Sequence, residues 1–428
     1  MESAAEIYSY DADPEELGPI NRAVSLIIKE PQFCPRDVSQ IDMKLMWWYT
    51  TCTYASFSVN GGWQGPADLI LKVIIPQRAF ETPFLMHVLL SLTATHVQFL
   101  KRDIEPGRVL AYRARAFAGY RNAVENPKPE EYPALLASSL LLSVVSAHMF
   151  REKETKELYI IDWIMIWRGI GLIIDLISPK ALWESGMAEL FYRPPLNLLA
   201  AVDHIPDYLA SMVDSIPAED EEYQFKEVYM RTLTYLGTLY MELRNGISPI
   251  MTLRVVTWFT FLPKPFVRLA REHRPIPLVI LAHYLVFLKL PLQVWWIENI
   301  SDREIPTIFN KVGLGYLDMM EVPLASIGVE GTANLGRLLF RDIEWNPPGA
   351  QLWRHGHAGL RRKLAFVDDT GRPLEYKQEW VVRGTDETAG PSWNYDFRET
   401  WKATLAERGR MGHPEELEGP GFLSNMDD

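Results

Sequence analysis

The chain has 428 residues, 48% of them hydrophobic, and a formal charge of −12 at pH 7. Its length and apolar content are sufficient for a large buried core. The negative charge disfavours contact with a phosphate backbone, so we predict that this chain does not bind nucleic acid directly. It has two cysteines, Cys34 and Cys52, which exclude a disulfide framework and a multi-cysteine zinc cluster, and we expect both thiols to be reduced.

Residues 1–36 are acidic and contain no apolar run of the kind that forms a signal peptide. We predict that they form a disordered leader. The first helix is expected to begin near Ser39, with Asp42 in its first turn, where a carboxylate interacts favourably with the helix dipole. Residues 60–62, Asn-Gly-Gly, are expected to follow the end of this helix.

The stretch Ile75–Leu100 is predicted to contain the central helix of the core. Pro83 fits the first turn of a helix, and Thr82 before it is positioned to cap the free N–H groups. Apolar residues then recur every three or four positions and form one stripe, with Ser91 and Thr95 on the polar side.

Similar spacing predicts further helices along the chain, separated mostly by proline, glycine or asparagine. The run 132–150 contains no Asp, Glu, Lys or Arg and approaches the length of a membrane span, but its small and hydroxylated side chains favour a buried helix. We therefore predict no membrane span. The other predicted helices are Val109–Val124, Leu158–Ile177, Glu221–Arg244, Met251–Leu262, Leu278–Leu288, Gln293–Ile300 and Ile305–Val322.

The composition changes after about Gly328. Residues 364–382 alternate between apolar and polar side chains around Asp369-Thr370-Gly371, a pattern that predicts a β-hairpin. The predicted fold is all-α: a multi-helix domain at 37–328, followed by a small irregular C-terminal appendage at 329–428 that contains the hairpin.

Sequence motifs for catalysis or metal binding are absent. His355 and His357 form a close pair without further ligands nearby, and there is no GxSxG, Walker or GxGxxG sequence. We therefore predict no catalytic residue, no metal site and no cofactor. His87, His96 and His148 lie in apolar helices and are expected to be core histidines bonded to backbone or hydroxyl groups.

Aromatic and methionine side chains in the predicted helices can either line an apolar ligand pocket or fill the core, and the sequence leaves both roles open. At any single position, core filling is the more common role. The side chains concerned are Trp163, Met165, Trp167, Trp258, Trp295 and Trp296.

Four stretches stand out for their order and spacing: Pro76–Gln98, Tyr112–Val124, Tyr132–Val144 and Asp162–Ile173. Together they resemble the helical regulatory domain of fungal zinc-cluster transcription factors, in the branch that controls sterol uptake. The most specific segments are 83–87, Pro-Phe-Leu-Met-His, and 167–169, Trp-Arg-Gly. The resemblance implies an all-α ligand sensor with a hydrophobic cavity and a tendency to dimerise.

The residues that we predict to bind the ligand lie in these stretches and beside them. They are Phe84, His87, Tyr112, His148, Trp163 and Trp167. Two departures from the family matter. Tyr112 stands where many relatives carry a histidine, and the family's six-cysteine zinc cluster is missing. The chain is therefore expected to be a piece of a longer regulator, a regulator without its own DNA-reading module, or a relative that has left transcription.

Three functions follow from the resemblance and its departures. The first is a transcription-factor-like regulator that senses an apolar small molecule, controls a fungal secondary-metabolite gene cluster and lies in the nucleus, with a second copy or another transcription factor as partner. The second is a cofactor-free cyclase or isomerase of an apolar polyketide or terpenoid, located in the cytoplasm, for which His87, His148, Asp162 and Tyr112 are the candidate proton-transfer groups. The third is a carrier or interaction module.

Overall fold

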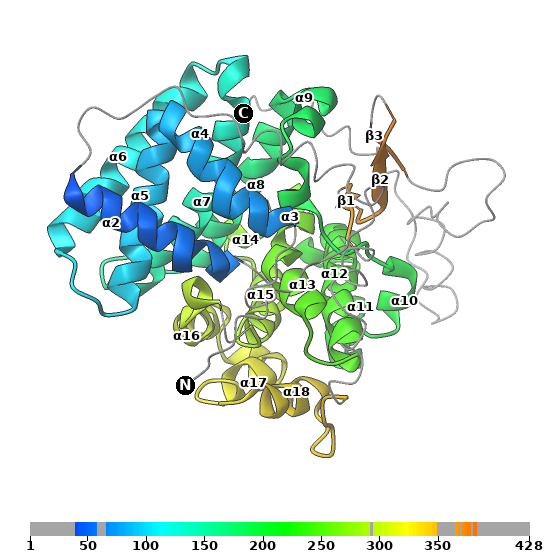
Figure 1. The fold of residues 1–428 in the computed structure, drawn as a ribbon. Coiled ribbons are helices and arrows are strands. Elements are labelled where there is room, and N and C mark those ends of the chain that lie inside the picture. The colour runs from blue at the N-terminus through cyan, green and yellow to red at the C-terminus, as the bar shows by residue number, and fades with distance from the viewer. Residues whose placement is uncertain are drawn as a thin grey trace, which may run out of the picture.

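The computed structural model describes residues 39–57, 66–291, 294–348, 364–368, 370–377 and 380–382. Several predicted features lie outside these residues: the leader 1–36, the turn at 60–62, Cys34, the pair His355 and His357, and anything after residue 382. The described residues form an all-α fold with a small antiparallel sheet near its C-terminal end, as the sequence predicts (Figure 1).

Helix α5 (Pro83–Phe99) is the centre of the N-terminal half of the fold. Its neighbours are α2 (Gln40–Trp48), α4 (Ile75–Glu81), α6 (Pro106–Glu125) and α7 (Tyr132–Ser146). Helix α8 (Tyr159–Leu176) packs against α7 and connects this group to the second half of the molecule (Figure 1).

Two details of α5 differ from the prediction. Thr82 occupies the N-cap position, but its side chain makes no capping hydrogen bond, so the predicted cap is wrong. Ser91 and Thr95 are buried instead of facing solvent. The Thr95 hydroxyl donates to the Ser91 carbonyl at 2.8 Å, and this bond within the helix lets a hydroxyl side chain lie among the neighbouring helices.

The second half of the fold is built around α15 (Pro275–Phe287), in which every residue from Ile276 to Phe287 is buried. The helices that precede it are α10 (Leu198–Val202), α11 (Asp207–Asp214), α12 (Lys226–Arg244), α13 (Pro249–Thr257) and α14 (Lys264–Arg271). Helices α12 and α14 pack directly against α15. A helix that is apolar on all sides requires such a cover.

Two predicted helices after α15 are wrong. In place of the predicted helix Gln293–Ile300, the described residues 294–299 contain a 3₁₀ turn, Trp295–Ile297, and the next α-helix begins at Ile300. The predicted helix Ile305–Val322 is two helices, because Gly313 ends the first with a φ of +76°. The helices in this part are α16 (Ile300–Val312), α17 (Leu317–Ala325) and α18 (Thr332–Phe340). Helix α18 follows the domain boundary predicted at residue 328.

The remaining elements are short. Two α-helices are α3 (Pro66–Leu69) and α9 (Pro179–Glu184), and two π-helical turns are η2 (Tyr49–Thr53) and η4 (Ile70–Ile74). The 3₁₀ turns not yet named are Tyr54–Phe57, Pro129–Glu131, η6 (Ala147–Arg151), Ala188–Phe191, Glu221–Phe225, η9 (Trp258–Phe261) and Leu314–Tyr316.

The predicted hairpin is confirmed. Strands β1 (Phe366–Val367), β2 (Pro373–Tyr376) and β3 (Trp380–Val382) form an antiparallel sheet in that order. In the first turn, Asp368 Oδ1 accepts hydrogen bonds from the backbone N–H groups of Thr370 and Arg372 at 2.9 and 2.8 Å. Gly371 has a φ of +81°, which glycine adopts without steric cost.

One helical segment among the described residues, Pro129–Arg151, is long and apolar enough to cross a membrane. In the folded chain, 78% of its most apolar window is buried against other helices. This burial agrees with the prediction of a core helix.

Candidate functional site

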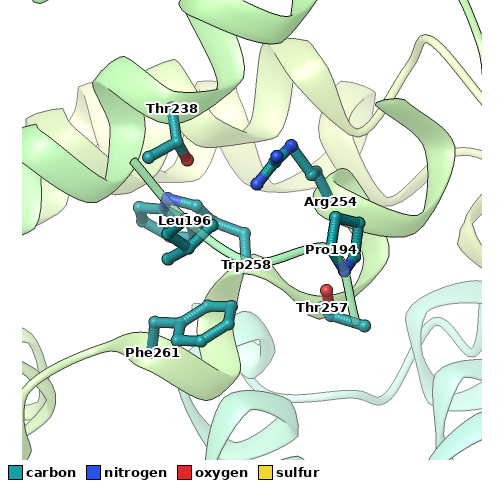
Figure 2. Close-up of a pocket in the computed structure, with 7 residues that line it drawn as sticks. All are labelled: Pro194, Leu196, Thr238, Arg254, Thr257, Trp258 and Phe261. Carbon is teal, nitrogen blue, oxygen red and sulfur yellow. The ribbon is translucent and has the colours of Figure 1, made fainter. Parts of the chain in front are cut away.

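A small hollow lies where α12, α13 and η9 meet the loop 192–197, which we call the strap. The residues that line it are Pro194, Leu196, Thr238, Arg254, Thr257, Trp258 and Phe261 (Figure 2). The space that the centre of a water molecule can occupy there is about 10 Å³, which is close to the minimum for one water. The lining is largely apolar, with one charged side chain.

Arg254 is the charged group of the hollow, and it is held on two sides. Its Nε donates to Glu242 Oε2 at 2.8 Å, and the exposed fractions of the two side chains are only 10% and 13%. Its Nη2 donates to the Pro195 carbonyl of the strap at 3.1 Å. A buried charge needs such a partner. The ion pair joins α13 to α12, and the bond to the Pro195 carbonyl ties the strap to α13.

The hairpin covers the strap from outside. Arg193 pairs with Ala365 through both backbone groups, at 2.8 and 3.1 Å, and the Leu196 N–H donates to the Gly371 carbonyl at 2.9 Å. The Arg193 guanidinium also donates to the Val367 carbonyl at 2.9 Å. The part of the predicted appendage that contains the hairpin therefore packs on the strap, which supplies Pro194 and Leu196 to the lining of the hollow.

An aromatic cluster extends from the hollow into the core. Trp258 stacks on Tyr284 with ring centroids 4.3 Å apart, and Tyr284 meets Phe259 edge-on. The ring centroid of Phe259 lies 5.2 Å from those of both Trp163 and Trp167. These rings, together with Trp295 and Trp296, are buried. Trp258 lines the hollow, and the other rings fill the core. Met165 is different, since 42% of its surface is exposed.

The six residues predicted to bind a ligand lie on four elements, and none of them lines the hollow. Phe84 and His87 are on α5, Tyr112 on α6, His148 on η6, and Trp163 and Trp167 on α8. The structure brings Trp163 and Trp167 together at 5.8 Å between ring centroids. Ligand binding by the six residues remains a prediction.

Tyr112 is anchored on α2. Its hydroxyl donates to Asp42 Oδ1, and Asp42 also completes a capping box with Ser39. Burial and then the bond to Asp42 raise the pKa of Tyr112. His87 lies within electrostatic range of the same carboxylate, but desolvation and then Arg115 lower its pKa.

The sequence predicts that His148 bonds to a backbone or hydroxyl group. In the structure it lies instead in a cluster of charged side chains. Its Nδ1 lies 2.6 Å from Arg113 Nη1 and 3.1 Å from Glu152 Oε1. Desolvation, and then the positive charge of Arg113, lower the pKa of His148 to about 4. His96, in contrast, follows the prediction, because its Nδ1 lies 3.0 Å from the Thr53 hydroxyl.

The four proton-transfer candidates for a cyclase or isomerase are held by different partners. Tyr112 binds Asp42, and His148 lies in the cluster with Arg113. Asp162 pairs with Lys156. No hydrogen bond or ion pair found among the described residues joins any two of the four candidates, so the geometry gives no specific support to that function.

Glu304 is a charged residue that the sequence analysis missed. It is fully buried on α16, and its Oε2 accepts from the Ile160 N–H at 3.3 Å, in the first turn of α8. Desolvation raises the pKa of Glu304 to about 7. No local pattern could have revealed this cap, because the two residues are 144 positions apart.

Within the described part of the chain, no three His, Cys, Asp or Glu side chains are grouped so that they could hold a metal ion. Cys52 is an exposed free thiol. The site is therefore defined by an aromatic core, a hollow of the size of one water and a buried arginine.

These features define the class of the molecule: an all-α domain with an aromatic core and a strap closed by a hairpin. No protein-family model matches the sequence. Sterol uptake control protein 2 of Candida albicans is 26% identical over an alignment of 298 positions, and the match covers 62% of this chain and 40% of the relative. The protein of the same name from Saccharomyces cerevisiae is 27% identical over an alignment of 299 positions, and the match covers 66% of this chain and 32% of the relative.

The chain is thus homologous to these two proteins and spans less than half of the length of each. The predicted resemblance to the sterol-uptake-control branch agrees with both matches.

Proposed function

We propose that the chain is a regulator of transcription whose helical domain senses an apolar small molecule. The observation that carries the proposal is the homology to Sterol uptake control protein 2, a zinc-cluster transcription factor, over 298 residues of the Candida albicans protein. The negative charge of the chain, −12, disfavours direct DNA contact. The proposal therefore includes another transcription factor as the partner that reads DNA, and a second copy of this chain as the partner in a dimer.

The relatives' name supports a sterol-like effector, and the apolar lining of the hollow is compatible with one. Pro194, Leu196 and Phe261 offer hydrophobic contacts next to Trp258. Since the hollow has room for about one water, a larger effector requires the strap to move outward. The strap is held by backbone hydrogen bonds to the hairpin and by side-chain bonds of Arg193 and Arg254. A neutral hydrogen bond contributes about 1 kcal/mol net, so moving the strap lowers the affinity that the effector would otherwise have.

Effector binding can be tested with a sterol. Ergosterol delivered from methyl-β-cyclodextrin is added to the purified full chain, with cyclodextrin alone as the blank, and tryptophan fluorescence and thermal stability are measured. Saturable quenching with a raised Tm is expected. Leu196→Trp should abolish binding by filling the hollow, whereas Leu199→Trp, at a position that is 50% exposed, should bind normally. No saturable change in the unmodified chain would contradict binding of this ligand class.

Regulation can be tested in the source organism. We propose that the regulated genes form a secondary-metabolite cluster around the gene and that the protein lies in the nucleus. Deleting the gene should change the transcripts of its genomic neighbours at least several-fold, and a fluorescently tagged chain should accumulate in the nucleus. Unchanged neighbouring transcripts would refute the regulatory proposal, even if the sterol binds.

A further inference from the structure

The hollow contains two buried hydrogen-bond donors without a protein acceptor. Among the described residues, Arg254 Nη1 and Trp258 Nε1 have no hydrogen-bond partner, although both side chains are at least nine-tenths buried. A buried donor without an acceptor costs about 1–3 kcal/mol. Two such donors at one hollow indicate that an acceptor binds between them.

The hollow also offers a hydrogen-bond acceptor. The Thr238 hydroxyl donates to the Tyr235 carbonyl at 2.6 Å, so its oxygen keeps a lone pair for a second hydrogen bond. In Figure 2, the Arg254 guanidinium extends toward the Thr238 hydroxyl and the indole nitrogen of Trp258. The group that fits must accept two hydrogen bonds and donate one.

The size of the hollow and the charge around it further limit which molecule can bind there. The space for the centre of a water-sized sphere is about 10 Å³, which admits about one water and no larger molecule. An anion is disfavoured, because Glu242 already neutralises Arg254 at 2.8 Å and a second buried negative charge would be left unpaired.

We propose that the hollow is a binding site for one structural water, which accepts from Arg254 Nη1 and Trp258 Nε1 and donates to Thr238 Oγ1. Three partners are typical of a buried water. This water accepts the remaining hydrogen bond of the guanidinium that also donates to the Pro195 carbonyl. It therefore helps to fix the strap. The proposal does not rest on the function proposed above.

The direct test is magnetisation transfer from water to the indole N–H protons of the full chain, measured by NMR. Trp258→Phe, which keeps an aromatic ring against Tyr284, assigns the Trp258 signal. A cross-peak with the sign of a long-lived bound water is expected for Trp258. The matched control is Trp296 Nε1, which is also buried and without a partner among the described residues but does not line the hollow; no cross-peak is expected there.

A pair of threonine variants gives a second measurement. Thr238→Val removes the acceptor for the water together with one bond to a backbone carbonyl. Thr234→Val, on the same helix, removes only a bond to a backbone carbonyl, from the Thr234 hydroxyl to the Met230 carbonyl at 3.0 Å. We expect the Tm of Thr238→Val to fall by about 2 °C more than that of Thr234→Val.

A crystal structure of the full chain at about 1.5 Å resolution decides the case. A spherical density peak within hydrogen-bond distance of the Arg254 and Trp258 nitrogens supports the proposal. An empty hollow, a hollow filled by a protein side chain, equal water cross-peaks at Trp258 and Trp296, or equal Tm losses for the two threonine variants would each overturn it.

Discussion

Glu304 should make the stability of the fold depend on pH in a characteristic way. Its carboxyl group is buried and accepts from the Ile160 N–H at 3.3 Å. Desolvation raises the pKa of this group from 4.5 to about 7 in the folded chain. A folded-state pKa above the unfolded one means that the folded chain holds the proton more tightly. The stabilisation is therefore fully present below pH 4.5 and is lost as the pH rises through about 7.

The size of this effect follows from the two pKa values. Each pH unit of difference corresponds to about 1.4 kcal/mol, so the shift from 4.5 to about 7 amounts to about 3 kcal/mol. Glu304→Gln keeps a carbonyl oxygen that can accept from Ile160 and does not titrate. We expect the variant to be more stable than the unmodified chain above pH 7, by about 2–3 kcal/mol, and the difference to shrink toward pH 4.5.

Urea unfolding of both proteins at intervals from pH 4.5 to 8.5 measures this difference directly. The buried histidines titrate in both proteins and therefore cancel in the comparison. A difference in the free energy of unfolding that stays constant over the whole range would show that Glu304 does not titrate with a raised pKa, and the reasoning would be refuted.

Three further predictions use single substitutions. Gly237→Ala should lower the free energy of unfolding by about 1–3 kcal/mol, because its Cβ would lie 2.3 Å from a backbone oxygen of α10. The control Gly169→Ala, whose Cβ would have nothing within 4 Å, should raise the free energy of unfolding by up to about 1 kcal/mol in the same urea assay. Equal effects of the two variants would contradict the close approach of α10 to Gly237. Desolvation lowers the pKa of His283 to about 4, so its stabilising contribution is present above pH 6.5 and lost as the pH falls; His283→Gln should reduce the acid-side slope of stability by up to about 1.4 kcal/mol per pH unit, and an unchanged slope would refute this. Gly371→Ala should speed proteolysis within 364–382 at least about fivefold, because the residue has a φ of +81° and its Cβ would lie 2.4 Å from a strap side chain. The control Gly328→Ala, at a φ of +75° but with open space around the Cβ, should not speed it.

Most of the helical fold was predictable because its signals are local. Proline marks the start of α5, α6, α13 and α15 at the first or second helical position, and the spacing of apolar residues then gives the extent of each helix. The hairpin was found in the same way, from Gly371 and the alternation around it. The break at Gly313 was not predicted, because the apolar periodicity continues across it and a single glycine does not always end a helix.

The candidate site was not predictable, because it depends on contacts between distant segments. Nothing in the sequence around Arg254 indicates that it pairs with Glu242 and holds the strap. The cap that Glu304 provides to α8 is equally invisible to local spacing. The aromatic residues were identified as a group, yet periodicity cannot distinguish a tryptophan that fills the core, such as Trp163, from one beside a hollow, such as Trp258.

The pairing of strap and hairpin also has a consequence for the newborn polypeptide. Arg193 and its partner Val367 are 174 residues apart, and ribosomes add about 5–20 residues per second. About 9 to 35 seconds therefore pass between the emergence of the two segments. During this interval the side of the strap that packs against the hairpin, including Leu196 beside Gly371, is uncovered. We therefore expect molecular chaperones to bind the nascent chain at that stage and to release it once the hairpin has docked.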